Sequence, residues 1–139
     1  MLMASSEGYR ERLARNAAAG RKLSQHQPEL HRAYWKVNRL AMQPGALDQA
    51  TKELIALALV VQARCDVCIS YHVRDCLRAG CTVEQLYEAL NVAVAEGDGP
   101  TMVYAGYAVE AIDEYLAADN AADGSDFAAA ETGPPPHRH

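Results

Sequence analysis

The stretch that decides the fold spans residues 47–82 and reads LDQATKELIALALVVQARCDVCISYHVRDCLRAGCT. Its run 54–61 is apolar nearly all round a helix, which is typical of a helix at the centre of a fold. Asp48 stands where an N-cap oxygen would start that helix, and Gly80 suits the position just past a helix end. A second helix would carry the Cys-x-x-Cys motif at 65–68. The sequence therefore predicts two adjacent central helices here.

Signals on both sides of this stretch predict further helices. Pro28 suits the first turn of a helix that ends at the Pro-Gly pair 44–45. Thr82 and Gln85 form a capping box for the next helix, and residues 97–100 are expected to form a loop before the last one. Together with a polar, Ala-rich first helix, these signals predict an all-α fold of about six helices.

The chain is expected to form one domain over residues 1–118. Residues 119–139 are rich in Ala, Asp and Gly and end in a run of prolines, so they lack the apolar residues needed to fold and are expected to be disordered. The segment 6–25 carries only a thin apolar stripe, and the final helix is rich in Ala. Both features predict that these helices pack against another subunit.

Composition narrows the class of protein. The chain has 139 residues and is 50% hydrophobic but only 6% aromatic, a balance typical of helical proteins. Its formal net charge of -5 does not favour a nucleic-acid or membrane-surface binder. Charges among the first fifteen residues interrupt any apolar signal segment, and the run 54–61 is too short to span a bilayer. A soluble, cytoplasmic protein is therefore expected, in which four cysteines favour catalysis or metal binding over structural disulfides.

The informative motif is formed by Cys65, Cys68 and His72, which fall within about 60° of arc on one face of a helix. Two sulfurs three residues apart at a helix start can form a disulfide with little rearrangement. The positive end of the helix favours a thiolate there, which points to Cys65. His72, one turn after Cys68, is close enough to exchange a proton with that cysteine. We expect Cys68 to be the nucleophile, because a local base also protonates the leaving group.

Glu53 is predicted to belong to the same site. On one straight helix, Glu53 and Cys65 would lie about 18 Å apart. If the chain instead turns back at 62–64, Glu53 and His72 reach a similar height on two antiparallel helices. Glu53 is flanked by apolar residues, and a buried carboxylate needs a partner. The expected arrangement is a nucleophile, a base and a carboxylate that orients the base.

The stretch 47–115 resembles the AhpD-like alkylhydroperoxidases, within the wider carboxymuconolactone decarboxylase family. The pattern is Glu53, eleven intervening residues and then Cys65-x-x-Cys68-x-x-x-His72, followed by Gly-Cys-Thr at 80–82 and the loop 97–100. The resemblance implies an AhpD-like helical bundle with a central helical hairpin that carries the Cys-x-x-Cys motif. It also implies a homo-oligomer, a trimer or a hexamer, and a thiol-dependent peroxidase without metal or cofactor.

The resemblance assigns roles to the site residues. Cys68 matches the peroxidatic cysteine, which attacks a peroxide oxygen and becomes a sulfenic acid, and Cys65 matches the resolving cysteine. His72 and Glu53 match the proton relay. The reductant implied is a dithiol, as in a dihydrolipoyl protein. Val67 departs from the family pattern, because the alkylhydroperoxidases carry a His there. A relay member is thus missing, which implies a weaker activity or a different preferred substrate.

Other functions remain open at this point. The same thiols would serve a thiol–disulfide exchange partner or redox sensor without efficient peroxide turnover. A carboxymuconolactone decarboxylase-type lyase is disfavoured, because its chemistry has no use for paired thiols. A structural zinc site of Cys65, Cys68 and His72, completed by Glu53 or Cys76, is disfavoured because a lone Cys-x-x-Cys half-site normally needs a second knuckle.

The remaining conspicuous residues have structural interpretations. Cys76 and Cys81 are expected to be small buried or half-exposed thiols outside catalysis. Four aromatic residues are expected to pack in the core or at a subunit interface rather than to line a substrate site: Tyr34, Trp35, Tyr104 and Tyr107.

Overall fold

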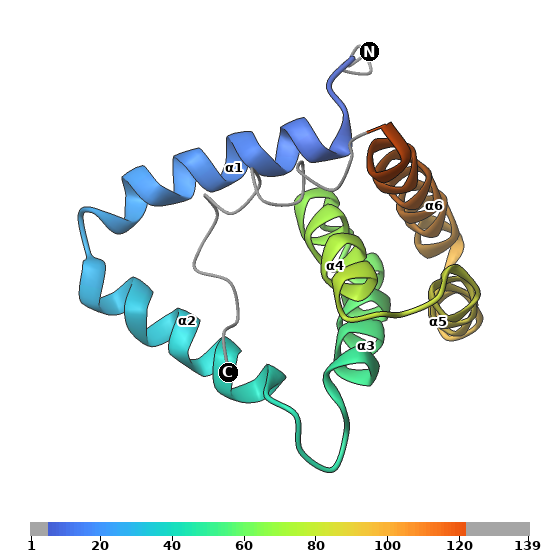
Figure 1. Cartoon of the computed structure of the whole chain (residues 1–139), viewed down its shortest axis with the longest axis horizontal. Coiled ribbons are helices and arrows are strands. Elements are labelled where there is room, and N and C mark those ends of the chain that lie inside the picture. The colour runs from blue at the N-terminus through green and yellow to red at the C-terminus, as the bar shows by residue number, and fades with distance from the viewer. Residues whose placement is uncertain (1–5, 122–139) are drawn as a thin grey trace.

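Six α-helices make up the computed structural model, which describes residues 6–121, and no strand occurs within that range. In chain order the helices are α1 (Tyr9–Ser24), α2 (Pro28–Met42), α3 (Gln49–Gln62), α4 (Asp66–Arg78), α5 (Val83–Ala95) and α6 (Gly99–Ala121). Helices α3 to α6 pack together, while α1 crosses one end of α4 and α6 and α2 lies off to one side (Figure 1). The predicted all-α fold of six helices is confirmed.

Local signals place the helix ends where the sequence predicts them. The Asp48 carboxylate accepts a hydrogen bond from the Thr51 N–H at the start of α3, and Pro28 occupies the first turn of α2. The capping box of Thr82 and Gln85 is complete, with both reciprocal hydrogen bonds present. These caps satisfy backbone groups that a helix end otherwise leaves without partners.

The start of α6 corrects one expectation. Residues 97–100 were expected to be a loop, but α6 already begins at Gly99. Asp98 acts as its cap, since its carboxylate accepts hydrogen bonds from the Thr101 N–H and hydroxyl at 3.0 and 2.9 Å. Pro100 fits the first turn, where its missing N–H costs no hydrogen bond. At its other end α6 continues to Ala121, and the rest of the predicted tail lies outside the described residues.

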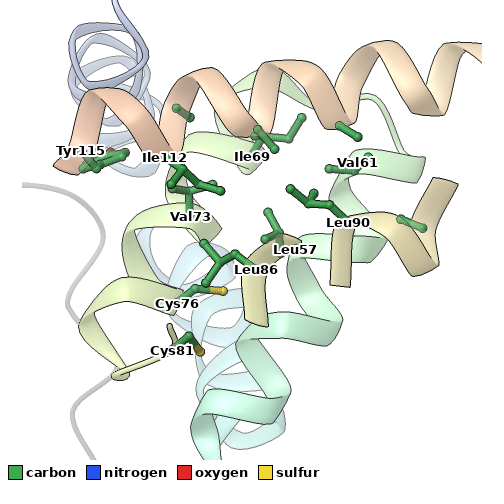
Figure 2. Close-up of a cluster of buried hydrophobic side chains, with 14 residues drawn as sticks. Leu57, Val61, Ile69, Val73, Cys76, Cys81, Leu86, Leu90, Ile112 and Tyr115 are labelled. Carbon is green, nitrogen blue, oxygen red and sulfur yellow. The ribbon is translucent and has the colours of Figure 1, made fainter. Parts of the chain in front are cut away.

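The core lies between α3, α4, α5 and α6 (Figure 2). Each of these helices contributes residues spaced three or four apart, which lie on one face. The largest apolar members are Leu57 and Val61 of α3, Ile69 and Val73 of α4, Leu86 and Leu90 of α5, and Ile112 and Tyr115 of α6. We predicted that α3 would be central and buried on all sides. Only its inner face is buried, because Ile55 and Leu59 on the other side are 45% and 63% exposed.

The first two helices contribute no buried residue. On α2, the residues Leu30, Tyr34, Val37 and Leu40 follow helical spacing and are all more than half exposed. An apolar stripe of this kind costs free energy in water and is typical of an interface. Tyr34 and Trp35 therefore do not lie in the core of a single chain. None of the helices in the described part of the chain is long and apolar enough to cross a membrane.

Candidate active site

The chain reverses between α3 and α4, as the sequence analysis requires. Arg64 adopts a positive φ of 58°, in the left-handed region that ends many helices. The Cys65 N–H then donates to the Val60 carbonyl at 3.2 Å, and the Arg64 N–H donates to the Val61 carbonyl at 3.1 Å. This pair of backward hydrogen bonds is a Schellman motif. It turns the chain so that α4 starts at Asp66 and packs along α3.

Cys65 lies at the N-cap of α4, with an extended backbone, rather than inside the helix. Its sulfur accepts the N–H of Cys68 at 3.3 Å, in the place usually taken by a Ser or Asp oxygen. A disulfide joins the two cysteines, whose Cα atoms are 5.2 Å apart. Both residues are partly exposed. The helix start therefore holds the pair in a geometry that suits a disulfide and stabilises negative charge on sulfur.

His72 and Glu53 meet across the two helices. The distance between His72 Nδ1 and Glu53 Oε2 is 2.9 Å, a hydrogen bond between residues 19 positions apart in the chain. The predicted contact between the carboxylate and the imidazole is thus present. Because Nδ1 is engaged, the imidazole keeps Nε2 for a thiol, a substrate or water. The carboxylate fixes which nitrogen faces outward.

Glu53 is almost completely buried, with 1% of its surface exposed. Its second oxygen, Oε1, has no hydrogen-bond partner within the described residues. Burying a carboxylate with only one partner is unfavourable, and such groups tend to serve a function rather than stability. The His72 side chain is 15% exposed, so the pair connects the interior with the surface near the cysteines.

Aromatic and cationic side chains hold the imidazole in place. The Tyr71 ring packs edge-on against His72, with centroids 5.1 Å apart, and the Arg74 guanidinium lies 4.6 Å from the centre of the Tyr71 ring. Burial raises the pKa of Tyr71 well above its usual range, and the Asp75 charge acts in the same direction. Tyr71 therefore stays neutral at physiological pH.

Two ion pairs flank the start of α4. Arg12 of α1 contacts Asp66 at 2.8 Å, and Arg64 contacts Asp98 at 2.7 Å. Exposed ion pairs of this kind contribute little to stability, because water screens the charges. Their effect is to fix where α1 and the α5–α6 connection lie relative to the cysteine pair.

A buried polar network around Ser70 of α4 was not predicted from the sequence. The Ser70 hydroxyl donates to the Tyr9 carbonyl at 3.0 Å and lies 3.1 Å from the Tyr115 hydroxyl. This network joins α1, α4 and α6. Ser70 lies beside the buried residue Ile69, and a polar residue on the inward face of α4 was the available signal.

The zinc alternative requires Cys65, Cys68, His72 and either Glu53 or Cys76 to converge. Across residues 6–121, no group of three or more His, Cys, Asp or Glu side chains is arranged to hold a metal ion. The two cysteines are instead joined to each other, and His72 is bound to Glu53.

These features define a class: an all-α protein with a cysteine pair at a helix start, beside an imidazole held by a buried carboxylate. The chain belongs to the carboxymuconolactone decarboxylase family, whose model matches residues 28–114. An uncharacterized protein of Cupriavidus necator is 43% identical over 91 residues, which cover 66% of this chain and 80% of that protein.

Solved structures agree with this assignment. A carboxymuconolactone decarboxylase family protein from Legionella pneumophila is 36% identical, with a TM-score of 0.72 over 76% of this chain and 96% of its own. A family protein from Thermotoga maritima, for which involvement in an antioxidative response has been suggested, is 29% identical, with a TM-score of 0.63. That match covers 66% of this chain and 95% of the Thermotoga protein.

Proposed function

We propose that this chain is a thiol-dependent peroxidase of the alkylhydroperoxidase type, which reduces hydrogen peroxide or organic hydroperoxides. One observation carries the proposal: the Cys65–Cys68 disulfide starts the helix on which His72, the next turn along, is held by the buried Glu53. Family membership and the antioxidative role suggested for the Thermotoga relative support the same class of reaction.

The oxidative half-reaction starts from the dithiol. His72 takes the proton of Cys68, and the Cys68 thiolate attacks the terminal oxygen of the hydroperoxide. The O–O bond breaks, and the departing hydroxide or alkoxide takes the proton from His72. Cys68 becomes a sulfenic acid. Glu53 does not touch the substrate and acts as a positioning residue, because it holds Nδ1 and leaves Nε2 for the proton transfers.

The resolving step uses the second cysteine. The Cys65 sulfur attacks the Cys68 sulfur, the S–OH bond breaks, and water leaves with the Cys65 proton. One hydroperoxide and two thiols thus give one alcohol or water, one further water and the disulfide. The Cα separation of 5.2 Å in the disulfide lies within the range usual for such bonds.

A dithiol reductant must then reopen the disulfide, and a dihydrolipoyl protein is our candidate. The first attack of such a reductant forms a mixed disulfide with one of the two partly exposed cysteines. No step in this cycle needs a metal or a cofactor. Because the cycle depends on a reducing dithiol pool, we place the protein in the cytoplasm.

We also propose that the protein is a homo-oligomer, a trimer or a hexamer, assembled through the α2 stripe. A second copy of the chain is the occupant that fits, since the four exposed apolar residues of the stripe lie on a helix that buries nothing in its own chain. The stripe is Leu30, Tyr34, Val37 and Leu40.

The second candidate function is thiol–disulfide exchange without efficient peroxide turnover. It is favoured by Val67, which occupies the position where alkylhydroperoxidases carry a relay His. The lyase alternative gives the cysteine pair no task and is not proposed. Exchange would need only an accessible disulfide and would tolerate loss of the His72–Glu53 pair.

Peroxide consumption with a dithiol donor tests these proposals. Reduced wild-type protein should lose two thiols per equivalent of hydroperoxide, far faster than free cysteine does. Cys68→Ser should abolish turnover, whereas Cys65→Ser should still react once and stop as a sulfenic acid that a dimedone probe traps. Slow oxidation together with rapid exchange against a dithiol would replace the peroxidase by the exchange function. Turnover retained in Cys68→Ser and lost in Cys65→Ser would reverse the two roles.

A further inference from the structure

The end of α4 brings the other two cysteines together. Gly80 has a φ of 88°, its N–H donates to the Leu77 carbonyl at 3.1 Å, and the Cys81 N–H donates to the Cys76 carbonyl at 3.0 Å. This is a second Schellman motif, and such motifs place the side chains of the residues at C3 and C″ in contact. Here those two residues are Cys76 and Cys81. An apolar pair is usual at these positions, so a pair of thiols stands out.

Both thiols are free and lie at the edge of the core (Figure 2). Cys76 is completely buried, and Cys81 is 6% exposed. The Cys76 thiol is hydrogen-bonded to the Cys81 sulfur, and the Cys81 thiol donates to the Ala50 carbonyl at 3.6 Å. The two thiols are thus neighbours in the folded chain while both are reduced.

We propose that Cys76 and Cys81 form a second two-electron redox site, which a hydroperoxide converts to a Cys76–Cys81 disulfide. The Cys81 sulfur attacks the peroxide, the O–O bond breaks, and one water or alcohol leaves with the thiol proton. The Cys76 sulfur then attacks the Cys81 sulfenic acid, the S–OH bond breaks, and a second water leaves. This site goes beyond the proposed peroxidase cycle, which uses neither residue.

The contacts assign the order of attack. Cys81 is the only one of the two with exposed surface, and the hydrogen bond from Cys76 favours its thiolate. Burial nevertheless raises the pKa of both thiols, most strongly that of Cys76, which makes Cys76 the resolving partner. Since thiolate is the reacting form, this pair reacts more slowly than an exposed pair at a helix start.

The two redox sites share one charge. Cys76 lies four residues after His72 on α4. Burial is the main cause that raises the pKa of both Cys76 and Cys81, and the Glu53 carboxylate that holds His72 acts in the same direction. Glu53 therefore orients the base of the first pair and adds to the burial that disfavours the thiolate form of the second. The Cys76–Cys81 disulfide would form only when peroxide persists beyond the capacity of the first pair. Its presence between the end of α4 and the start of α5 would indicate that the chain has met excess peroxide.

Peptide mapping of the reduced, full-length chain tests this inference. Trypsin cuts after Arg64, Arg74 and Arg78, so Cys65 and Cys68 share the peptide 65–74, whereas Cys76 and Cys81 fall on different peptides, 75–78 and 79–138. After titration with hydrogen peroxide and alkylation, the first disulfide should appear within one peptide. The second should appear later, as two peptides that separate on reduction.

Glu53→Gln tests how Glu53 affects the rate at which each of the two disulfides forms. The variant should form the Cys65–Cys68 disulfide more slowly than wild type and the Cys76–Cys81 disulfide no more slowly than wild type. Absence of the 75–78/79–138 cross-link after complete oxidation of the first pair would overturn the inference. A cross-link that forms only under denaturing conditions would also overturn the inference. Far-ultraviolet circular dichroism shows whether the chain is folded when the cross-link forms.

A double variant separates this inference from the proposed function. Cys65→Ser combined with Cys68→Ser should lose the fast peroxide turnover with a dithiol donor, yet should still form the cross-link between Cys76 and Cys81. Wild-type turnover without any cross-link would refute only the second site. A cross-link in a protein that never turns over peroxide would refute only the peroxidase.

Discussion

Replacement of Glu53 by Gln tests whether the buried carboxylate serves catalysis or the fold. The amide keeps the shape of the side chain and still accepts a hydrogen bond from His72 Nδ1, now 2.9 Å from Glu53 Oε2. What it removes is the negative charge that stabilises the imidazolium formed when His72 takes the Cys68 proton. The oxidative half-reaction should therefore slow, while the reduction of the disulfide by an external dithiol should not.

The magnitude follows from the single hydrogen bond that changes. A hydrogen bond to a charged group contributes about 1.5–3 kcal/mol, and one between neutral groups about 0.5–1.5 kcal/mol. The difference, about 1–1.5 kcal/mol, corresponds to a decrease of about 5- to 13-fold in the rate of thiol oxidation. Stability should not fall, because the variant replaces a 1% exposed carboxylate, whose Oε1 has no partner within the described residues, by a neutral amide.

The assay is stopped-flow oxidation of the reduced protein by hydrogen peroxide, with thermal unfolding measured on the same samples. Glu88→Gln is the matched control, because it makes the same chemical change at an exposed position of α5. An unchanged oxidation rate in Glu53→Gln would refute the positioning role. An equal loss in both half-reactions together with a lower melting temperature would show that Glu53 supports only the fold.

Three further predictions concern the turn, the missing relay residue and the α2 stripe. Val67→His should restore the family's relay position and raise the rate of peroxide consumption by about 10-fold or more, and a rate at the wild-type level would contradict that view. Arg64 has a φ of 58°, so Arg64→Gly should relieve strain and Arg64→Val should increase it. The two variants should differ by about 1–2 kcal/mol in the free energy of unfolding, measured by urea titration, and equal midpoints would count against a strained turn. Combining Tyr34→Glu with Val37→Glu should reduce the molar mass seen by light scattering to the 15.1 kDa of one chain, and a wild type that is already monomeric would remove the proposed interface.

The sequence alone determined most of the helix boundaries and which residues carry the proposed chemistry. Asp48, Thr82 with Gln85, and Gly80 are local signals, because each acts through hydrogen bonds or dihedral angles within a few residues. The spacing of Cys65 and Cys68 likewise fixes their proximity within one helical turn. The start of α6 was missed because Gly99 and Pro100 suggest a loop, whereas the Asp98 cap starts the helix.

The sequence predicted that Glu53 and His72 would meet if the chain turned back at 62–64, but only the tertiary structure decided that it does. The contact between Glu53 and His72 depends on a turn at Arg64 that no glycine announces, and on the packing of α3 against α4. The hydrogen bonds at the end of α4 bring Cys76 and Cys81 together, and this contact was not predicted from the sequence. Helix caps and turns depend on residues within about one helical turn of each other. The position of the buried Glu53 carboxylate depends instead on how α3 packs against α4.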